Sequence, residues 1–222
     1  MSFARIYAIA LNTYREAVRD RVLFGVLALA AGVLALTLAL GELSLDQQMR
    51  VVTDLGMASI SLFSVVVAIF LGSSLLYKEI ERKTLYVILP KPIARFEFLL
   101  GKYFGIVATC AVFIAIMGAL QLLVTAIQAD ASTALVVGVP VALAVLLGIA
   151  FFFVKDRTVV VPIWSLVALG ATAWVCSTVD VEVYRLLASL LLGLGEVLIL
   201  TAVALLFSSF STPFLTGAFT FG

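Results

Sequence analysis

Apolar residues fall into six long runs along the chain, and short polar segments separate these runs. The runs cover residues 22–40, 57–77, 104–127, 133–154, 159–177 and 186–207. A helix rises about 1.5 Å per residue, so about 20 apolar residues cross the roughly 30 Å hydrocarbon core of a bilayer. The pattern therefore predicts six full transmembrane helices.

The N-terminal segment, residues 3–20, has a different pattern. Its apolar residues recur at the i, i+3, i+4, i+7 spacing of one helical face, and most of its charged residues fall on the other side. The apolar set is Phe3, Ile6, Tyr7, Ala10, Tyr14, Ala17 and Val18. The segment is too charged to span a bilayer, so we expect an amphipathic helix in the membrane interface. Two roles are open for this helix: a simple interfacial anchor, or an elbow that helps to hold a cytoplasmic partner. Residues 3–20 taken by themselves favour the anchor.

The C-terminal residues contain one more apolar run. Ser211 or Thr212 before Pro213 is a helix-start signal, and residues 214–222 are apolar but too few to cross a bilayer. We expect a partial seventh span in a chain that stops inside it, rather than a short re-entrant tail.

Composition supports the membrane class. The chain is 64% hydrophobic and 12% charged, whereas soluble domains are about half apolar and a quarter charged. Its net charge of +1 indicates no nucleic-acid partner. We therefore predict a single all-α, polytopic transmembrane domain over residues 1–222, with membrane lipids around it.

The distribution of basic residues predicts the orientation. If the N-terminus is cytoplasmic, only Arg50 and Arg185 of the fourteen Lys and Arg residues lie in outside loops. This strong positive-inside bias predicts a multi-pass protein of the inner (cytoplasmic) membrane with a cytoplasmic N-terminus. The first outer loop is expected to contain Glu42, Asp46, Arg50 and Asp54, and the last one Asp180, Glu182 and Arg185.

The residues give little support to catalysis. The chain has no His, and no Walker A or Gly-x-Ser-x-Gly pattern occurs. Cys110 and Cys176 lie far apart inside apolar runs and are expected to be packing residues rather than a disulfide. We predict no catalytic residue, no metal site and no cofactor bound by this chain.

Glu196 is the one ionisable residue deep inside a predicted span. Such an acid is costly in a membrane and is a functional candidate by default. It binds a cation, relays a proton or lines a substrate path; alternatively, it is protonated and hydrogen-bonded to a neighbouring helix. Ser73, Ser74 and Gln121 are polar in spans and are expected to make hydrogen bonds between helices.

The longest charged segment is residues 78–103. It is expected to form a helix to about residue 89, a stiff corner at Pro90 and Pro92, and a second helix from about Ala94 that continues as the third span. The second helix places Phe96, Leu99, Leu100 and Tyr103 on one side. Gly101 and Gly105 are four residues apart, a spacing that lets helices approach closely. The segment is a solvated positive-inside loop or a docking element that passes movement to both flanking spans.

Three stretches resemble the type-2 permease family, the membrane subunits of ATP-binding-cassette exporters. "ALNTYREAVRDRVLFG" resembles the family's elbow helix, and "EVLILTAVALLFSSFSTPF" its Ser-rich helix exit. "YKEIERKTLYVILPKPIARFEFLLGKYFG" resembles its cytoplasmic coupling loop, which sits in a groove of the ATPase subunit. The coupling residues implied by this resemblance are Glu79, Glu81, Arg82, Lys83, Thr84, Pro90, Pro92, Arg95 and Lys102.

The resemblance also has implications for partners. It implies a separate ATPase subunit that carries ATP and Mg, and a second permease copy or a sister permease. The chain departs from the family pattern because residues 133–178 look like an added helical hairpin, and because further spans after the Ser-rich stretch are missing.

These observations favour the permease subunit of an exporter, with no enzymatic activity of its own. One alternative is a secondary transporter or channel that uses Glu196. A second alternative is a membrane scaffold for the assembly of another complex.

Overall fold

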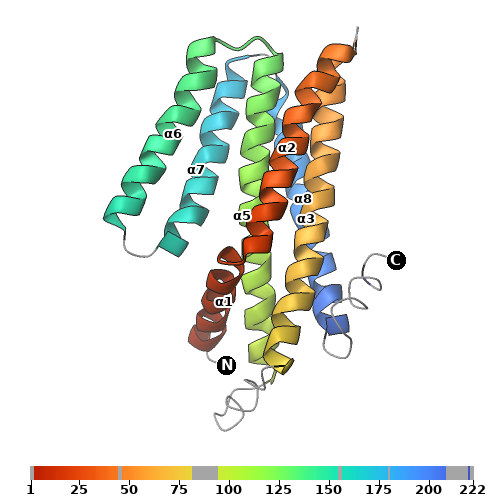
Figure 1. The fold of residues 1–222 in the computed structure, drawn as a ribbon, viewed down its shortest axis with the longest axis vertical. Helices are drawn as coiled ribbons and strands as arrows, with labels where there is room; N and C mark the ends of the chain where they lie inside the picture. Colours follow the sequence, from red (N-terminus) through yellow and green to blue (C-terminus); the bar gives the residue numbers. More distant parts are fainter. Residues whose placement is uncertain are drawn as a thin grey trace. The chain divides into compact units, whose positions relative to one another are not determined.

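Helices form all of the regular secondary structure in the described part of the chain. The computed structural model describes residues 3–44, 47–81, 95–154, 157–179, 181–208 and 220, and only the backbone of residues 75–81, 95, 157 and 158. The helices are α1 (Phe3–Val18), α2 (Arg21–Leu43), α3 (Gln48–Glu81), α5 (Arg95–Gln128), α6 (Thr133–Phe153), α7 (Arg157–Ser177) and α8 (Val183–Ser208). Figure 1 shows them in sequence colours.

Six helices are long and apolar enough to cross a membrane, which confirms the predicted number of full spans. They are α2, α3, α5, α6, α7 and α8, whose apolar parts have 19 to 33 residues. Within a bilayer, a helix satisfies its backbone hydrogen bonds internally, which explains why each apolar run is one continuous helix. The predicted partial seventh span falls on residues that, apart from Thr220, lie outside the described part of the chain.

The boundaries of two spans differ from the predicted ones. The apolar run predicted a second span from Met57, but α3 begins at Gln48; the last span was expected from Leu186, but α8 begins at Val183. Arg50, Asp54 and Arg185 therefore lie on helices, as does Glu42 near the end of α2, and the prediction that they lie in loops is wrong. The physical reason is that an apolar run marks only the part of a helix that lies in lipid. Backbone hydrogen bonding carries the helix further, into segments with polar side chains.

The chain divides into two compact units, and several helices contribute to both. The first unit, called here the terminal unit, contains residues 1–24, 64–111 and 194–222. The second, called the central unit, contains residues 25–63 and 112–193.

In the central unit, a buried cluster joins three helices. Leu122 and Ala126 of α5 pack against Val175 and Cys176 of α7 and Leu186 of α8. The Cys176 thiol donates to the Leu122 carbonyl at 3.0 Å. Cys110 and Cys176 are both buried free thiols, which confirms that they are packing residues rather than a disulfide.

Polar side chains join α3 to α5 in the same unit. The buried Gln121 donates from Nε2 to the Val52 carbonyl at 3.1 Å. Between the same two helices, Gln128 Nε2 donates to Gln48 Oε1 at 2.9 Å. A Cβ added to Gly56 would overlap the amide of Gln121, so the glycine makes room for this side chain. The prediction that Gln121 hydrogen-bonds between helices is confirmed.

The pair α6 and α7 forms a hairpin in the central unit, as Figure 1 shows. Leu143 and Ala168 pack together with Ala119 of α5, and Trp164 lies beside them. The indole N–H of Trp164 donates to the Leu143 carbonyl at 3.0 Å. Few residues of α6 are buried, so this hydrogen bond is one of a small number of specific contacts that hold it.

The two Trp residues of the chain provide a test of this packing. Trp164→Phe keeps an aromatic ring but removes the bond to Leu143, so we expect the free energy of unfolding to fall by about 1 kcal/mol. Denaturant titration in detergent micelles would measure it. The matched control is Trp174→Phe in the same helix, whose indole is 60% exposed; it should change stability little. Equal losses for both variants would contradict the role of the Trp164 bond.

Candidate functional site

The first candidate site is the contact of α1 with the beginning of α5, both in the terminal unit (Figure 1). A Cβ on Gly105 would lie 2.6 Å from Cβ of Thr13 and 2.7 Å from the Ala10 carbonyl oxygen. A Cβ on Gly101 would lie 2.6 Å from Cβ of Ile9. These neighbours are backbone or β-carbon atoms and cannot swing away. Glycine at both positions therefore sets how closely the two helices approach, as the four-residue spacing predicted.

The packed face of α1 includes part of the apolar set expected from the sequence. Tyr14 and Ala17 of that set are buried together with Thr13, whereas Phe3 and Tyr7 are largely exposed. The buried part is the C-terminal half of the helix, which contains Thr13, the residue that meets Gly105. Phe3 and Tyr7 remain available to a membrane interface, and the interfacial position of α1 stays a prediction. Burial raises the pKa of Tyr14 to about 12, so this phenol stays neutral.

Charged residues also connect α1 with α5. Glu97 is 5% exposed although it lies in the first turn of α5, and Arg5 lies 4.0 Å from its carboxylate. The position of Glu97 near a helix N-terminus suits a carboxylate, because the helix dipole is positive there. The apolar Phe96, Leu99 and Leu100, which were expected to share one side, are all exposed. The beginning of α5 thus buries a charge and presents apolar side chains, as suits a surface next to lipid.

Lys102 has a structural position that the sequence did not reveal. Its side chain is 1% exposed, and its ammonium group lies 5.5 Å from the centre of the Phe98 ring. The neighbouring Tyr103 hydroxyl donates to the Leu198 carbonyl of α8 at 3.2 Å. A side chain buried in this way supports the packing of α5. The role of Lys102 in coupling stays a prediction.

The other predicted coupling residues lie at or beyond the edges of the described chain. Glu79 and Glu81 are in the last turns of α3, and Arg95 is the first residue of α5; their side chains are not described. Arg82, Lys83, Thr84, Pro90 and Pro92 lie outside the described residues. Their roles stay predictions. The expected second helix of this segment is present, since α5 begins at Arg95 and continues through the third span.

The contact of α3 with α8 in the terminal unit also depends on a glycine. A Cβ on Gly72 would lie 2.8 Å from Cβ of Ala204. The Ser208 hydroxyl donates to the Ser73 carbonyl at 3.3 Å, whereas the Ser73 hydroxyl bonds within its own helix to Phe70. The expectation that the Ser73 hydroxyl bonds between helices is wrong, because a serine hydroxyl readily reaches a carbonyl of the preceding turn. The buried Ser74 hydroxyl has no hydrogen-bond partner within the described chain.

Glu196 lies near the middle of α8 and is exposed on the surface of the chain. The neighbouring Gly195 has open space where a Cβ would be, and Leu192 and Ile199 of the same helix are also exposed. An acid on an exposed face in the middle of an apolar helix is costly when lipid covers it. This face of α8 is therefore a candidate surface for a partner inside the membrane.

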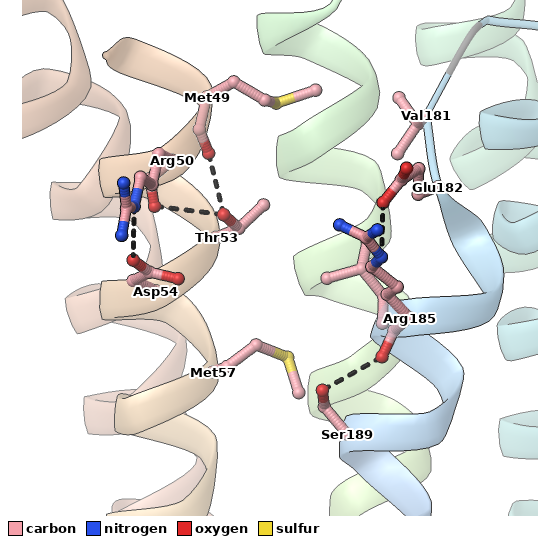
Figure 2. A pocket seen from close by; sticks show the side chains of 10 residues that line it. Met49, Arg50, Thr53, Asp54, Met57, Val181, Glu182, Arg185 and Ser189 are labelled. Carbon is pink, nitrogen blue, oxygen red and sulfur yellow. Dashed lines mark hydrogen bonds and ion pairs between the residues drawn. The ribbon is translucent and has the colours of Figure 1, made fainter.

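The second candidate site is a cavity of about 810 Å³ in the central unit. Its walls come from the first turns of α3 and from the start of α8 (Figure 2). The residues that carry its charges are Arg50, Asp54, Glu182 and Arg185, which the sequence had assigned to loops. The sequence did hold a signal: the charges are spaced i, i+4 in one case and i, i+3 in the other. The Arg50–Asp54 pair lies within α3, and Glu182, directly before α8, pairs with Arg185 in the first turn of that helix.

Among the described residues, no group of His, Cys, Asp or Glu could hold a metal ion. The two candidate sites thus contain ion pairs, hydroxyls and close helix contacts, but no arrangement that suggests catalysis.

The chain was compared with models of protein families. A family model described as "ABC-2 family transporter protein" matches residues 7–161. No curated protein matches the chain. The matched range contains most of α1, the segment between α3 and α5, and all of α6. It therefore includes a large part of the 133–178 hairpin that looked like an addition, whereas Glu196 lies beyond it.

The glycine contact between α1 and α5 predicts a specific loss of stability. Gly105→Ala forces the helices apart, so we expect the free energy of unfolding to fall by about 1–3 kcal/mol. Backbone amides of residues 3–18 should also exchange hydrogen faster. Thermal unfolding in detergent and hydrogen-exchange mass spectrometry would measure both effects.

The matched control is Gly195→Ala in the same unit, where a Cβ meets nothing within 4 Å. Alanine has the higher helix propensity, so this variant should be as stable as the original chain or slightly more stable. Unchanged exchange in α1 of the Gly105→Ala chain would show that the close approach does not hold α1 in place.

Proposed function

Because the chain belongs to the ABC-2 family of transporter proteins, we propose that it is the membrane-spanning permease subunit of an ATP-binding-cassette exporter. In this proposal the chain moves a substrate across the cytoplasmic membrane and performs no covalent chemistry. A separate partner subunit binds ATP and Mg and supplies the energy by hydrolysis. The N-terminus and the 78–103 segment lie in the cytoplasm, in agreement with the positive-inside bias.

The family match over residues 7–161 is the observation that carries this proposal. It includes α1 and the charged segment, which are the two places where a cytoplasmic partner would bind. The chain combines six full spans with one long charged segment, which also suits a membrane subunit whose movement is driven by a cytoplasmic partner.

The helices suggest how a push on the 78–103 segment would reach the membrane. Glu79 and Glu81 are on the same continuous helix as the second span, and Arg95 begins the helix of the third span. A helix is stiff along its axis, so displacement of either end moves the span as well. α1 follows α5, because Gly101 and Gly105 leave no slack between them. The partner would thereby move α1, α3 and α5 together.

A second permease copy, or a sister permease, would cover the exposed face of α8. Glu196 and the neighbouring Gly195 would then face another protein chain rather than lipid. In such an interface the acid can be hydrogen-bonded or hydrated, which lowers its cost in the membrane.

Two other functions make different predictions. A secondary transporter or channel would depend on Glu196 and on an ion gradient, and it would work without any ATPase. A scaffold for the assembly of another complex would move no substrate at all.

Crosslinking and ATP hydrolysis would test the docking assignment. With cysteine introduced at Glu81, we expect a crosslink to a co-expressed ATP-binding-cassette ATPase from the same genome. The two native cysteines are buried and should not react. Glu81→Ala and Arg95→Ala should each lower the stimulation of ATP hydrolysis by this chain about tenfold, since each removes a charged contact worth about 1.4 kcal/mol or more.

The control positions are on the predicted opposite side of the membrane. Glu42 is an exposed acid at the end of α2, so Glu42→Cys should give no crosslink, and Glu42→Ala should stimulate ATP hydrolysis by the partner as well as the original chain does. The docking assignment fails if the Glu81 and Arg95 variants stimulate ATP hydrolysis as well as the original chain does.

Neutralisation of Glu196 separates an interface role from an ion-coupling role. Glu196→Gln keeps the size and hydrogen-bonding ability of the side chain but removes its charge. We expect ATP-dependent function to survive within about twofold, because an interface needs only a hydrogen-bonding group there. Glu196→Leu should weaken association of two copies, measured by mass photometry in nanodiscs. Complete loss of transport in Glu196→Gln, with association intact, would favour the secondary transporter instead.

A further inference from the structure

The cavity in the central unit has two chemically different walls, and this difference identifies a class of ligand. Its volume, about 810 Å³, falls within the range of about 300–1,000 Å³ that is common for small-molecule sites. α3 begins at Gln48 and α8 at Val183, so the first turns of two helices line it. Figure 2 shows the two walls facing each other.

α3 contributes two methionines to the cavity, together with Arg50, Thr53 and Asp54. Met49, Thr53 and Met57 recur every four residues and point towards α8 in Figure 2. The Thr53 hydroxyl donates to the Met49 and Arg50 carbonyls of its own helix, at 2.9 and 3.0 Å, so its proton is not offered to the cavity. Two flexible thioethers therefore supply the apolar groups that α3 turns towards α8. Methionine side chains adapt to apolar groups of varied shape.

The opposite wall carries a guanidinium group. Arg185 points from α8 into the space between the helices in Figure 2. Its Nε lies 2.6 Å from the Glu182 carboxylate and 3.0 Å from the Tyr184 hydroxyl oxygen. Both contacts use Nε, and the guanidinium carbon lies 5.8 Å from the centre of the Tyr184 ring. The two terminal nitrogens carry four further N–H donors in a planar arrangement that matches a phosphate or a carboxylate.

We propose that this cavity binds an amphipathic anion, with the apolar body of the ligand against Met49 and Met57 and its phosphate or carboxylate on the terminal nitrogens of Arg185. The ligand comes from the membrane as a lipid, or from solution as a free amphiphile. Both sources offer the same chemistry to the site.

The balance of charge around the cavity favours an anion at Arg185. The first turns of α3 and α8 contribute the positive ends of two helix dipoles. The carboxylate of Glu182 competes for Arg185, but both side chains are more than half exposed, and ion pairs of this kind are weak and easily exchanged. Arg50 and Asp54 form a second exposed pair, and in Figure 2 they lie on the side of α3 away from α8. That pair adds no net charge to the site.

This inference deepens the proposed function, because an exporter needs a place for its substrate or for a regulating lipid. The binding measurement below uses the purified chain without ATPase or ATP. A failure to dock an ATPase would leave its result unchanged, and a failure to bind the ligand would leave the docking assignment unchanged.

Fluorescent lysophosphatidic acid is the probe for the purified 222-residue chain in detergent. It combines one acyl chain with a phosphate, and fluorescent monoacylglycerol supplies the same chain without a charge. We expect saturable binding of the phosphate lipid and at least tenfold weaker binding of the neutral one. Inorganic phosphate at the same concentration should not displace the probe, because it lacks the apolar body.

Two substitutions should change the dissociation constant of fluorescent lysophosphatidic acid in opposite directions. Arg185→Gln removes the anion-binding group and should raise it about tenfold. Glu182→Gln removes the competing carboxylate and should lower it by about twofold to fivefold. Arg19→Gln, an exposed position in the terminal unit with the same loss of charge, should leave it unchanged. Thermal unfolding of each variant would show that it is folded.

Several results would overturn the inference. Equal binding of the neutral lipid would contradict the claim that the site selects an anionic group. Displacement of the probe by inorganic phosphate would contradict the claim that the ligand needs an apolar body. Saturable binding of a fluorescent alkylammonium to the original chain, weakened in the Glu182→Gln chain, would assign the cavity to a cation. An unchanged dissociation constant in a folded Arg185→Gln chain would place the ligand elsewhere.

Discussion

The close approach of α1 to α5 at Gly101 and Gly105 is the contact on which this account depends. Apolar helices in a bilayer gain little from burying apolar surface against one another, since lipid tails are equally apolar. Van der Waals contact and hydrogen bonds must hold them instead. Two glycines let the backbone of α1 come close to α5, and no side chain larger than hydrogen fits at either position. A helix held in this way moves with its neighbour, which a coupling element requires.

The same constraint explains the contacts elsewhere in the two units. Gly72 meets Ala204 in the terminal unit, and Gly56 makes room for the amide of Gln121 in the central unit. Side-chain amides, hydroxyls, a thiol and an indole then provide the directional contacts between helices. Each hydrogen bond contributes only about 0.6 kcal/mol on average in membranes, so stability is spread over many of them. The less buried helices, such as α6, depend on fewer.

The sequence predicted the six spans well, because the length of an apolar run is directly related to bilayer thickness. It predicted the ends of the helices less well, because polar residues there continue the helix beyond the apolar run. Arg50 and Arg185 were assigned to loops because an apolar run ends where lipid ends, whereas a helix ends where its backbone hydrogen bonding stops. The cavity that these helix extensions create was therefore not predicted. The spacing of apolar residues in α1 correctly included the buried Tyr14 and Ala17, but it did not show that Thr13 is buried while Phe3 and Tyr7 are exposed.

Charged residues near the ends of spans were the hardest to interpret. Lys102 was grouped with residues that contact a partner, but its side chain is buried beside Phe98. Glu97 is buried as well, next to Arg5 of a helix far away in sequence. A sequence shows that such residues are charged, but their burial depends on the packing of α1 against α5.

The most direct test of the central claim is the rate of ATP hydrolysis by the partner ATPase in nanodiscs, with and without this chain. The account predicts a rate several times higher when the chain is present, and equal rates would contradict it.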